Sequence, residues 1–180
     1  EEEERIREVK KRSEDLLEEL KRSNERVERE SDKLAEEIRR KLEELARRAD
    51  EVIRRLRARK ETEELKKLAD ELRKLVDEVR KRAERLIRED KRMVEEVKRR
   101  SRELIERDKR VVETIERLLR AGEPTEKLLE DLKRINKETE RLNRELLRDL
   151  ERINEETRER IDRLLRELER MIDELRKRVD

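Results

Sequence analysis

The chain of 180 residues contains 56 Lys and Arg and 54 Asp and Glu, so 61% of it is charged while its formal net charge is only +2. It has no aromatic residue, no Cys, no His, one Gly and one Pro. This composition excludes disulfides, thiolate or imidazole catalysis and the commonest metal ligand. Balanced charges under a regular apolar pattern are typical of long helices rather than of disordered chains.

The first predicted helix covers about residues 2–59, because apolar residues recur there at steps of three and four positions. The pattern then breaks. Asp70 stands 18 residues beyond Val52, where an apolar residue is due. We therefore expect a turn near Arg59–Thr62, with Thr62 as the N-cap of the next helix. A continuous helix through this segment is the alternative.

The second predicted helix covers about residues 62–121 and ends at the sequence AGEPT. Gly122 stands where a left-handed residue is favoured after a helix, and Pro124 stands where a helix can begin. The third predicted helix covers about 124–179 and repeats one phrase three times, as TEKLLEDLKRINKETERL, NRELLRDLERINEETRER and IDRLLRELERMIDELRKR. Eighteen residues make five helical turns, so the apolar stripe stays on one face of a straight helix.

Three helices of similar length, each about 85 Å long at 1.5 Å per residue, must pack antiparallel to their neighbours when short turns join them. Paired apolar positions such as Leu146 and Leu147 make a stripe wide enough to contact two partners. The sequence thus predicts an all-α fold, a long, straight, antiparallel up-down-up three-helix bundle with 18-residue repeats. We expect residues 1–180 to form a single domain.

Polar residues interrupt the apolar stripes at matched positions of the three helices. When the chain is folded at its two turns, facing residues have numbers that sum to about 121 and about 245. The polar residues then fall into three groups: Ser13, Asp108, Asn136 and Thr139; Ser31, Asp90, Asn154 and Thr157; and, between them, Asn24, Ser101 and Asn143. Because carboxylates accept hydrogen bonds that Asn, Ser and Thr donate, we predict buried networks that fix helix register. The alternative is that these side chains lie at the stripe edge and reach water.

No catalytic, cofactor-binding or metal-binding residue is predicted. Asp90 and Asp108 lie about 27 Å apart along one helix, and one carboxylate in each layer makes no ligand set. The basic run Lys98–Arg102 is flanked by Glu and has no aromatic neighbour, so we expect no nucleic-acid binding. Other charges are predicted to form surface pairs four residues apart, such as Glu95 with Arg99.

No apolar run exceeds two residues, so the sequence contains neither a membrane span nor a signal-peptide core. We expect a soluble chain with no targeting signal, consistent with cytoplasmic recombinant expression, and no membrane partner.

The ideal repeats, the missing aromatics, the surface of Glu and Arg, the compact GEPT connector and the polar layers together resemble de novo designed parametric helical bundles, especially those with designed buried hydrogen-bond networks. The resemblance covers the whole chain, but it is one of style and implies no functional residue. Buried Asp departs from the Asn, Gln, Ser and Thr expected of such networks. The resemblance implies a monomeric structural scaffold with no enzyme activity, cofactor or natural substrate. The alternatives are an interaction module, one chain of a designed homo- or hetero-oligomeric bundle, and a natural spectrin-like or coiled-coil protein.

Overall fold

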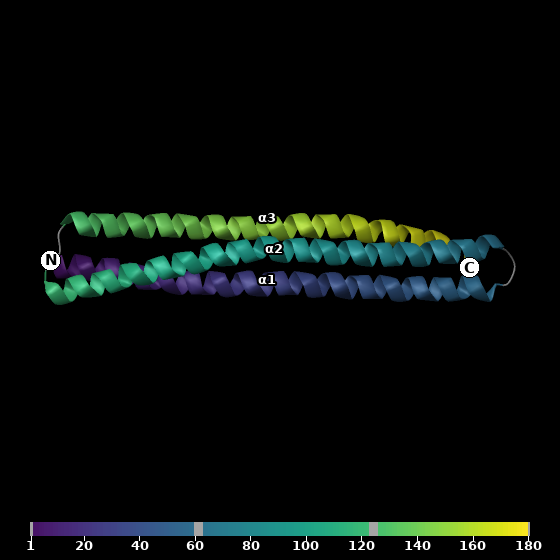
Figure 1. Ribbon diagram of the computed structural model, residues 1–180, viewed down its shortest axis with the longest axis horizontal. Helices are drawn as coiled ribbons and strands as arrows, with labels where there is room; N and C mark the ends of the chain where they lie inside the picture. The colour runs from purple at the N-terminus through teal and green to yellow at the C-terminus, as the bar shows by residue number, and fades with distance from the viewer. Residues whose placement is uncertain (1, 60–62, 123–125, 180) are drawn as a thin grey trace. The chain divides into compact units, whose positions relative to one another are not determined.

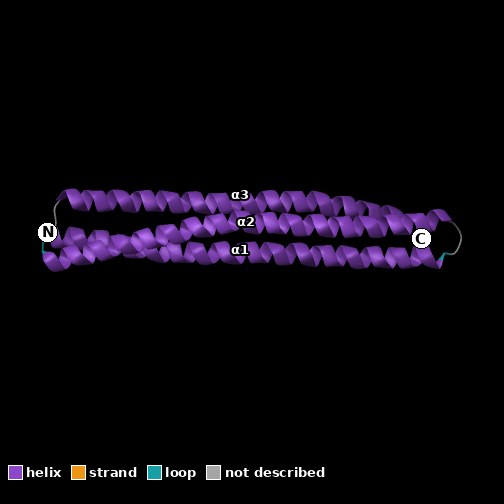
Figure 2. Ribbon diagram, viewed as in Figure 1, coloured by secondary structure: helices purple, strands orange, loops and turns teal. Residues whose placement is uncertain are grey.

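The computed structural model describes residues 2–59, 63–122 and 126–179. These residues form three helices and, apart from the helix ends, nothing else (Figures 1 and 2): α1 (Glu2–Ala58), α2 (Glu63–Ala121) and α3 (Glu126–Val179). No strand occurs in this described part of the chain. The predicted all-α three-helix bundle is confirmed.

The end of α2 follows from a single glycine. Gly122 has a φ of 68°, in the left-handed region, and its N–H donates a hydrogen bond of 3.1 Å to the carbonyl of Leu118. This bond gives a hydrogen-bond donor to one of the carbonyls that the end of a helix would otherwise leave without a partner. The glycine predicted to end the helix therefore does so. The predicted start of the third helix at Pro124 lies outside the described residues.

The first connection also interrupts the helix. α1 ends at Ala58, and Arg59 is already non-helical although its N–H still donates to the carbonyl of Arg55 at 3.3 Å. α2 begins at Glu63 with an acidic first turn, which suits the positive end of the helix dipole. The alternative of a continuous helix through this segment is therefore wrong. The proposed N-cap, Thr62, lies outside the described residues.

Contacts divide the chain into two compact units, each containing a segment of every helix. Unit 1 comprises Glu1–Glu30 and Met93–Arg152, and unit 2 comprises Ser31–Arg92 and Ile153–Asp180. Unit 1 thus joins the start of α1 to the end of α2 and the start of α3, so α2 runs antiparallel to its two neighbours. Ion pairs in unit 1 agree, since Arg5–Glu126 at 3.4 Å and Arg26–Glu151 at 3.3 Å require α1 and α3 to run parallel. The expectation of a single domain stays a prediction.

The two units differ in their interiors. Among the described residues, 24 buried apolar side chains belong to unit 2 and 15 to unit 1. All five alanines that are buried among these described residues belong to unit 2, and small side chains let helices approach closely. In the described part of the chain, seven buried polar residues belong to unit 1 and four to unit 2. Unit 1 therefore gives a larger share of its interior to polar groups.

Candidate functional site

The polar residues that the sequence singles out lie inside the two units. Unit 1 contains the Asp108 layer, which we define as Ser13, Asp108, Asn136 and Thr139, and the central cluster of Asn24, Ser101 and Asn143. Unit 2 contains the Asp90 layer, defined as Ser31, Asp90, Asn154 and Thr157. All of these side chains are buried except Asn24, which is half-buried. The alternative that they lie at the stripe edge and reach water does not fit this burial.

In the Asp90 layer the carboxylate receives hydrogen bonds. The hydroxyl of Thr157 donates to Oδ1 of Asp90 at 2.8 Å, which joins α3 to α2. Ser31 of α1 also contributes a hydrogen bond to this carboxylate. Oδ1 of Asn154 is buried and has no hydrogen-bond partner among the described residues. All three helices thus meet at Asp90, while the Asn amide oxygen is left out.

The Asp108 layer has the opposite arrangement. Ser13 donates to Oδ1 of Asn136 at 3.1 Å, and Nδ2 of Asn136 donates back to the Ser13 hydroxyl at 2.8 Å. Both carboxylate oxygens of Asp108 and the hydroxyl of Thr139 are buried without a hydrogen-bond partner in the described chain. The layer therefore brings two of its four members together and leaves the other two apart.

The residues of the central cluster are not joined to one another. Oδ1 of Asn24, Oγ of Ser101 and Oδ1 of Asn143 are all buried, and none of these atoms has a hydrogen-bond partner among the described residues. The third predicted layer thus shares a location in unit 1 but shows no network. That each layer forms a complete network stays a prediction.

Burial changes the acidity of both aspartates. Asp108 is fully buried, and the loss of hydration alone raises its pKa from the ordinary 3.8 to about 6. Burial also raises the pKa of Asp90, but the hydrogen bonds from Thr157 and Ser31 and the charge of Lys91 oppose that effect. The difference follows from the hydrogen bonds, because a carboxylate that receives donors is stabilised in its charged form.

Sequence reasoning missed Ser23, which is also buried, in unit 1. A signal was available, because Ser23 lies three residues after Leu20 and four before Val27, which is the spacing of the apolar stripe. Sequence reasoning also did not predict that Arg100 would be partly buried. The Arg100 guanidinium donates to Asp149 at 2.8 Å, although its Nε is buried without a partner in the described chain.

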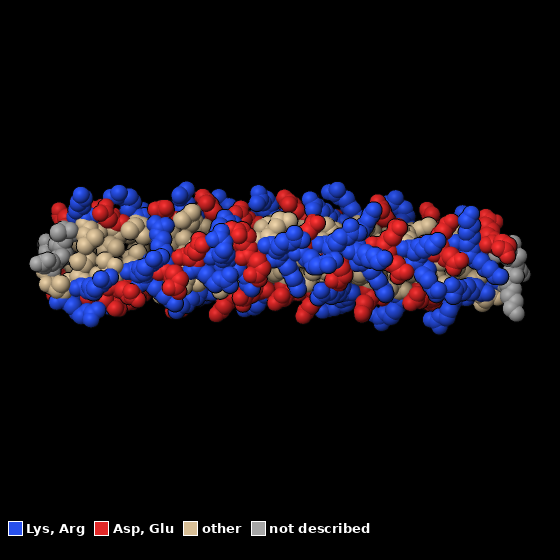
Figure 3. All heavy atoms as spheres, in the orientation of Figure 1, with Lys and Arg blue, Asp and Glu red and all other residues tan. Residues whose placement is uncertain are grey.

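Acidic side chains pair with Lys98, Arg99 and Arg100 of the basic run Lys98–Arg102. Lys98 pairs with Glu28 at 3.2 Å, and Arg99 pairs with Glu103 at 2.6 Å. The predicted pairing of Arg99 with Glu95 is wrong, because Arg99 instead contacts Glu103 and Glu96. On the face visible in Figure 3, Lys and Arg alternate with Asp and Glu rather than gathering in one patch.

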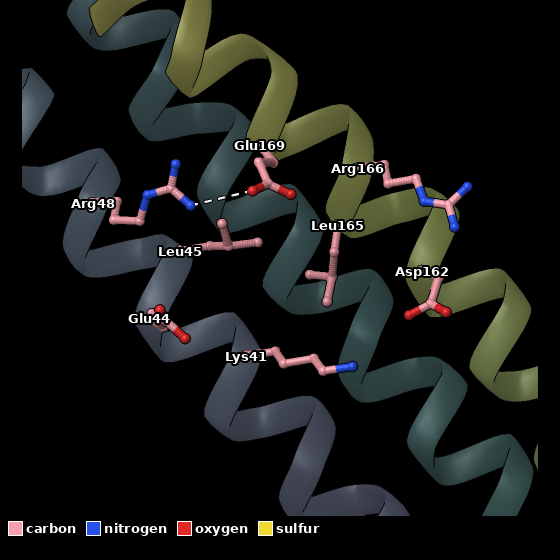
Figure 4. A pocket seen from close by; sticks show the side chains of 8 residues that line it. All are labelled: Lys41, Glu44, Leu45, Arg48, Asp162, Leu165, Arg166 and Glu169. Atoms are coloured by element: carbon pink, nitrogen blue, oxygen red, sulfur yellow. Dashed lines mark hydrogen bonds and ion pairs between the residues drawn. The ribbon is translucent and has the colours of Figure 1, made fainter.

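A groove of about 370 Å³ lies between α1 and α3 in unit 2. In Figure 4, Leu45 and Leu165 lie between the two helices and charged side chains surround them. Arg48 crosses the groove to Glu169 at 3.3 Å and also pairs with Asp173 at 2.9 Å. Within the groove, Arg48 and Glu169 are thus already engaged in an ion pair.

The described residues contain no group of three or more Asp, Glu, His or Cys that could hold a metal ion. None of the described helices contains an apolar stretch of the length that a membrane span requires. Comparison with protein-family models, with curated protein sequences and with solved structures finds no significant match.

Proposed function

We propose that this chain is a structural scaffold of designed origin without a natural substrate, in which buried polar layers specify how the helices align. The 18-residue repeat and the uniform Glu and Arg surface support a designed origin, because such regularity resembles that of parametric bundles. The proposed role is to hold three helices in one register.

The observation that carries the proposal is the coverage of apolar side chains within one chain. Among the large hydrophobic residues described, only Met93 is exposed, at 41%. Unit 2 buries its apolar residues in one cluster that includes Leu56, Leu72 and Leu168, all fully buried. A chain that covers its own apolar surface needs no partner to be stable.

The polar layers support the proposed role in register. Sliding one helix by seven residues would keep many apolar residues facing one another, so apolar packing alone discriminates weakly between registers. The same slip would move Asp90 away from Thr157 and against apolar side chains, at a cost of about 1–3 kcal/mol or more. A buried polar layer thus penalises the wrong alignment.

Light scattering coupled to size-exclusion chromatography tests the scaffold proposal. We expect a mass of 22.4 kDa that stays constant over a roughly hundredfold range of protein concentration. A mass that rises with concentration would contradict a self-contained scaffold. Asp90→Leu tests register in the same chain: we expect helicity to persist while amide resonances multiply, and the exposed Asp32→Leu serves as the control.

A second candidate function is an interaction module, one chain of a helical oligomer. A groove of about 410 Å³ between α2 and α3 of unit 1, with Leu104, Leu142 and Leu146 along it, favours this alternative. Uncharged surface is also visible over the end of α2 and the start of α3 in Figure 3. Leu118 of α2 and Leu128 of α3 are partly exposed. The same mass measurement distinguishes a self-associating module from a monomeric scaffold.

A further inference from the structure

The two aspartate layers are copies of one arrangement of residues. Moving 18 positions forward along α2 leads from Asp90 to Asp108, and moving 18 positions back along α3 leads from Thr157 to Thr139. Because α2 and α3 are antiparallel, these opposite steps preserve which residues face each other. The same step along α1 leads from Ser31 back to Ser13. The two layers therefore contain the same side chains in the same register.

Their hydrogen bonds are nevertheless different. In the Asp90 layer, hydroxyl groups bond to the carboxylate and the Asn154 amide oxygen has no partner among the described residues. In the Asp108 layer, Ser13 and Asn136 bond to each other, and Asp108 and Thr139 are the ones without partners in the described chain. One set of four residue types thus supports two bonding arrangements.

The charge of the aspartate decides which arrangement costs less. A buried carboxylate without donors loses its hydration and gains nothing in return, whereas a neutral carboxyl group is much cheaper to leave without a partner. Donation from Thr and Ser to the carboxylate removes most of that cost and leaves only a neutral amide oxygen unpaired, as at Asn154. The ionised aspartate therefore favours the arrangement of the Asp90 layer, and the neutral one tolerates the arrangement of the Asp108 layer.

Charged groups on all three helices surround the Asp108 layer, but they are already engaged with one another. The pairs that bridge the helices there are Arg12 with Glu140 at 2.7 Å, Arg107 with Glu138 at 3.1 Å, and Lys10 with Glu116 at 3.9 Å. All six side chains are half-buried or exposed, whereas Asp108 is fully buried. The partners that can respond to Asp108 within the layer are therefore Ser13, Asn136 and Thr139.

We infer that the Asp108 layer is a proton-controlled conformational switch. With Asp108 protonated, Ser13 bonds to Asn136. With Asp108 ionised, Ser13 and Thr139 rotate to donate to the carboxylate, and Asn136 is released, as Asn154 is in the Asp90 layer. One proton thus selects between two side-chain arrangements inside an otherwise unchanged three-helix core.

Nuclear magnetic resonance of the uniformly labelled full chain, titrated from acid to neutral pH, tests the switch. The Asp108 carboxyl carbon reports ionisation, the Thr139 methyl carbon reports its rotamer, and the Asn136 side-chain amide reports its bonding. We expect all three signals to change with one shared midpoint, at or below about pH 6. The Thr157 methyl carbon should keep one rotamer across that midpoint, because its hydroxyl already bonds to Asp90.

Two variants separate a switch from a simple titration. Asp108→Asn should abolish the pH-dependent changes at Asn136 and Thr139. Thr139→Val removes a donor of the ionised state, so we expect a roughly tenfold smaller acid dissociation constant for Asp108, a midpoint about one pH unit higher. The inference is overturned if Asp108 ionises while Asn136 and Thr139 stay unchanged, or if Thr139→Val leaves the midpoint where it is.

Discussion

Replacing Asp108 with Asn should make the chain more stable near neutral pH. The substitution keeps the size of a fully buried side chain and removes its charge. Burial raises the pKa of Asp108 in the folded protein, so the folded state holds this proton more tightly than the unfolded chain. The associated stability is fully present below about pH 4 and is lost as the pH rises through about 6.

The size of the effect follows from the two pKa values. The difference between about 6 in the fold and the ordinary 3.8 corresponds to about 3 kcal/mol at neutral pH. Any rearrangement that brings donors to the carboxylate reduces this loss, so about 3 kcal/mol is an upper limit. We therefore expect Asp108→Asn and the parent chain to have similar unfolding free energies at pH 3.5, and the variant to be more stable at pH 7.5 by up to this amount.

Urea unfolding followed by circular dichroism measures this difference, since the chain has no aromatic residue to give a fluorescence signal. The unfolding free energy of the parent chain is subtracted from that of Asp108→Asn at each pH. This subtraction removes the contribution of every other ionisable group, including Glu84, whose pKa the neighbouring Arg39 lowers. Asp15→Asn changes the same formal charge at an exposed position and serves as the control. A difference between the Asp108→Asn and parent chains that does not grow between pH 4 and pH 7 would refute the reasoning.

Three further predictions concern single residues. At pH 3.5, where Asp108 is protonated, Thr139→Val should stabilise the chain by on the order of 1 kcal/mol, because the lost hydroxyl has no partner among the described residues. At pH 7.5, Thr157→Val should destabilise it by about 1–3 kcal/mol, because Asp90 loses a hydrogen-bond donor. Urea unfolding of each variant beside the parent chain measures both effects. Leu168→Ala, at a fully buried site in unit 2, should cost about 2–5 kcal/mol in the same assay. Gly122→Ala should destabilise the chain by about 1–2 kcal/mol through its left-handed backbone alone, since nothing lies within 4 Å of an added Cβ. Thermal unfolding checks this beside Gly122→Asn, which should cost less because Asn adopts this conformation more readily.

The elements and their order could be predicted because each leaves a local signal. Apolar residues at helical spacing mark the three helices, and Gly122 marks the end of the second through a conformation that other residues adopt at a cost. The first turn has no Gly or Pro. Only the break in the apolar repeat, where Asp70 stands at a position due for an apolar residue, indicated it. The direction of each helix followed from the short connections.

The membership of the polar layers could also be predicted, but their hydrogen bonds could not. The 18-residue repeat makes Asp90 and Asp108 equivalent in sequence, and nothing in the pattern distinguishes Thr157 from Thr139. Which hydroxyl bonds to which acceptor depends on side-chain rotamers and on the charge of each aspartate. The division into two units likewise has no marker in the sequence, since every helix continues through both.

The seam between α1 and α3 has a practical consequence, because these two helices are not consecutive in the chain and side-chain contacts join them. Arg12 pairs with Glu140 at 2.7 Å in unit 1, and Arg48 pairs with Asp173 at 2.9 Å in unit 2. Cutting the backbone after Gly122 would therefore yield a helical hairpin and a separate single-helix peptide that can recombine. Mixing the two fragments would then measure how tightly α3 packs against the hairpin, as the dissociation constant of their complex.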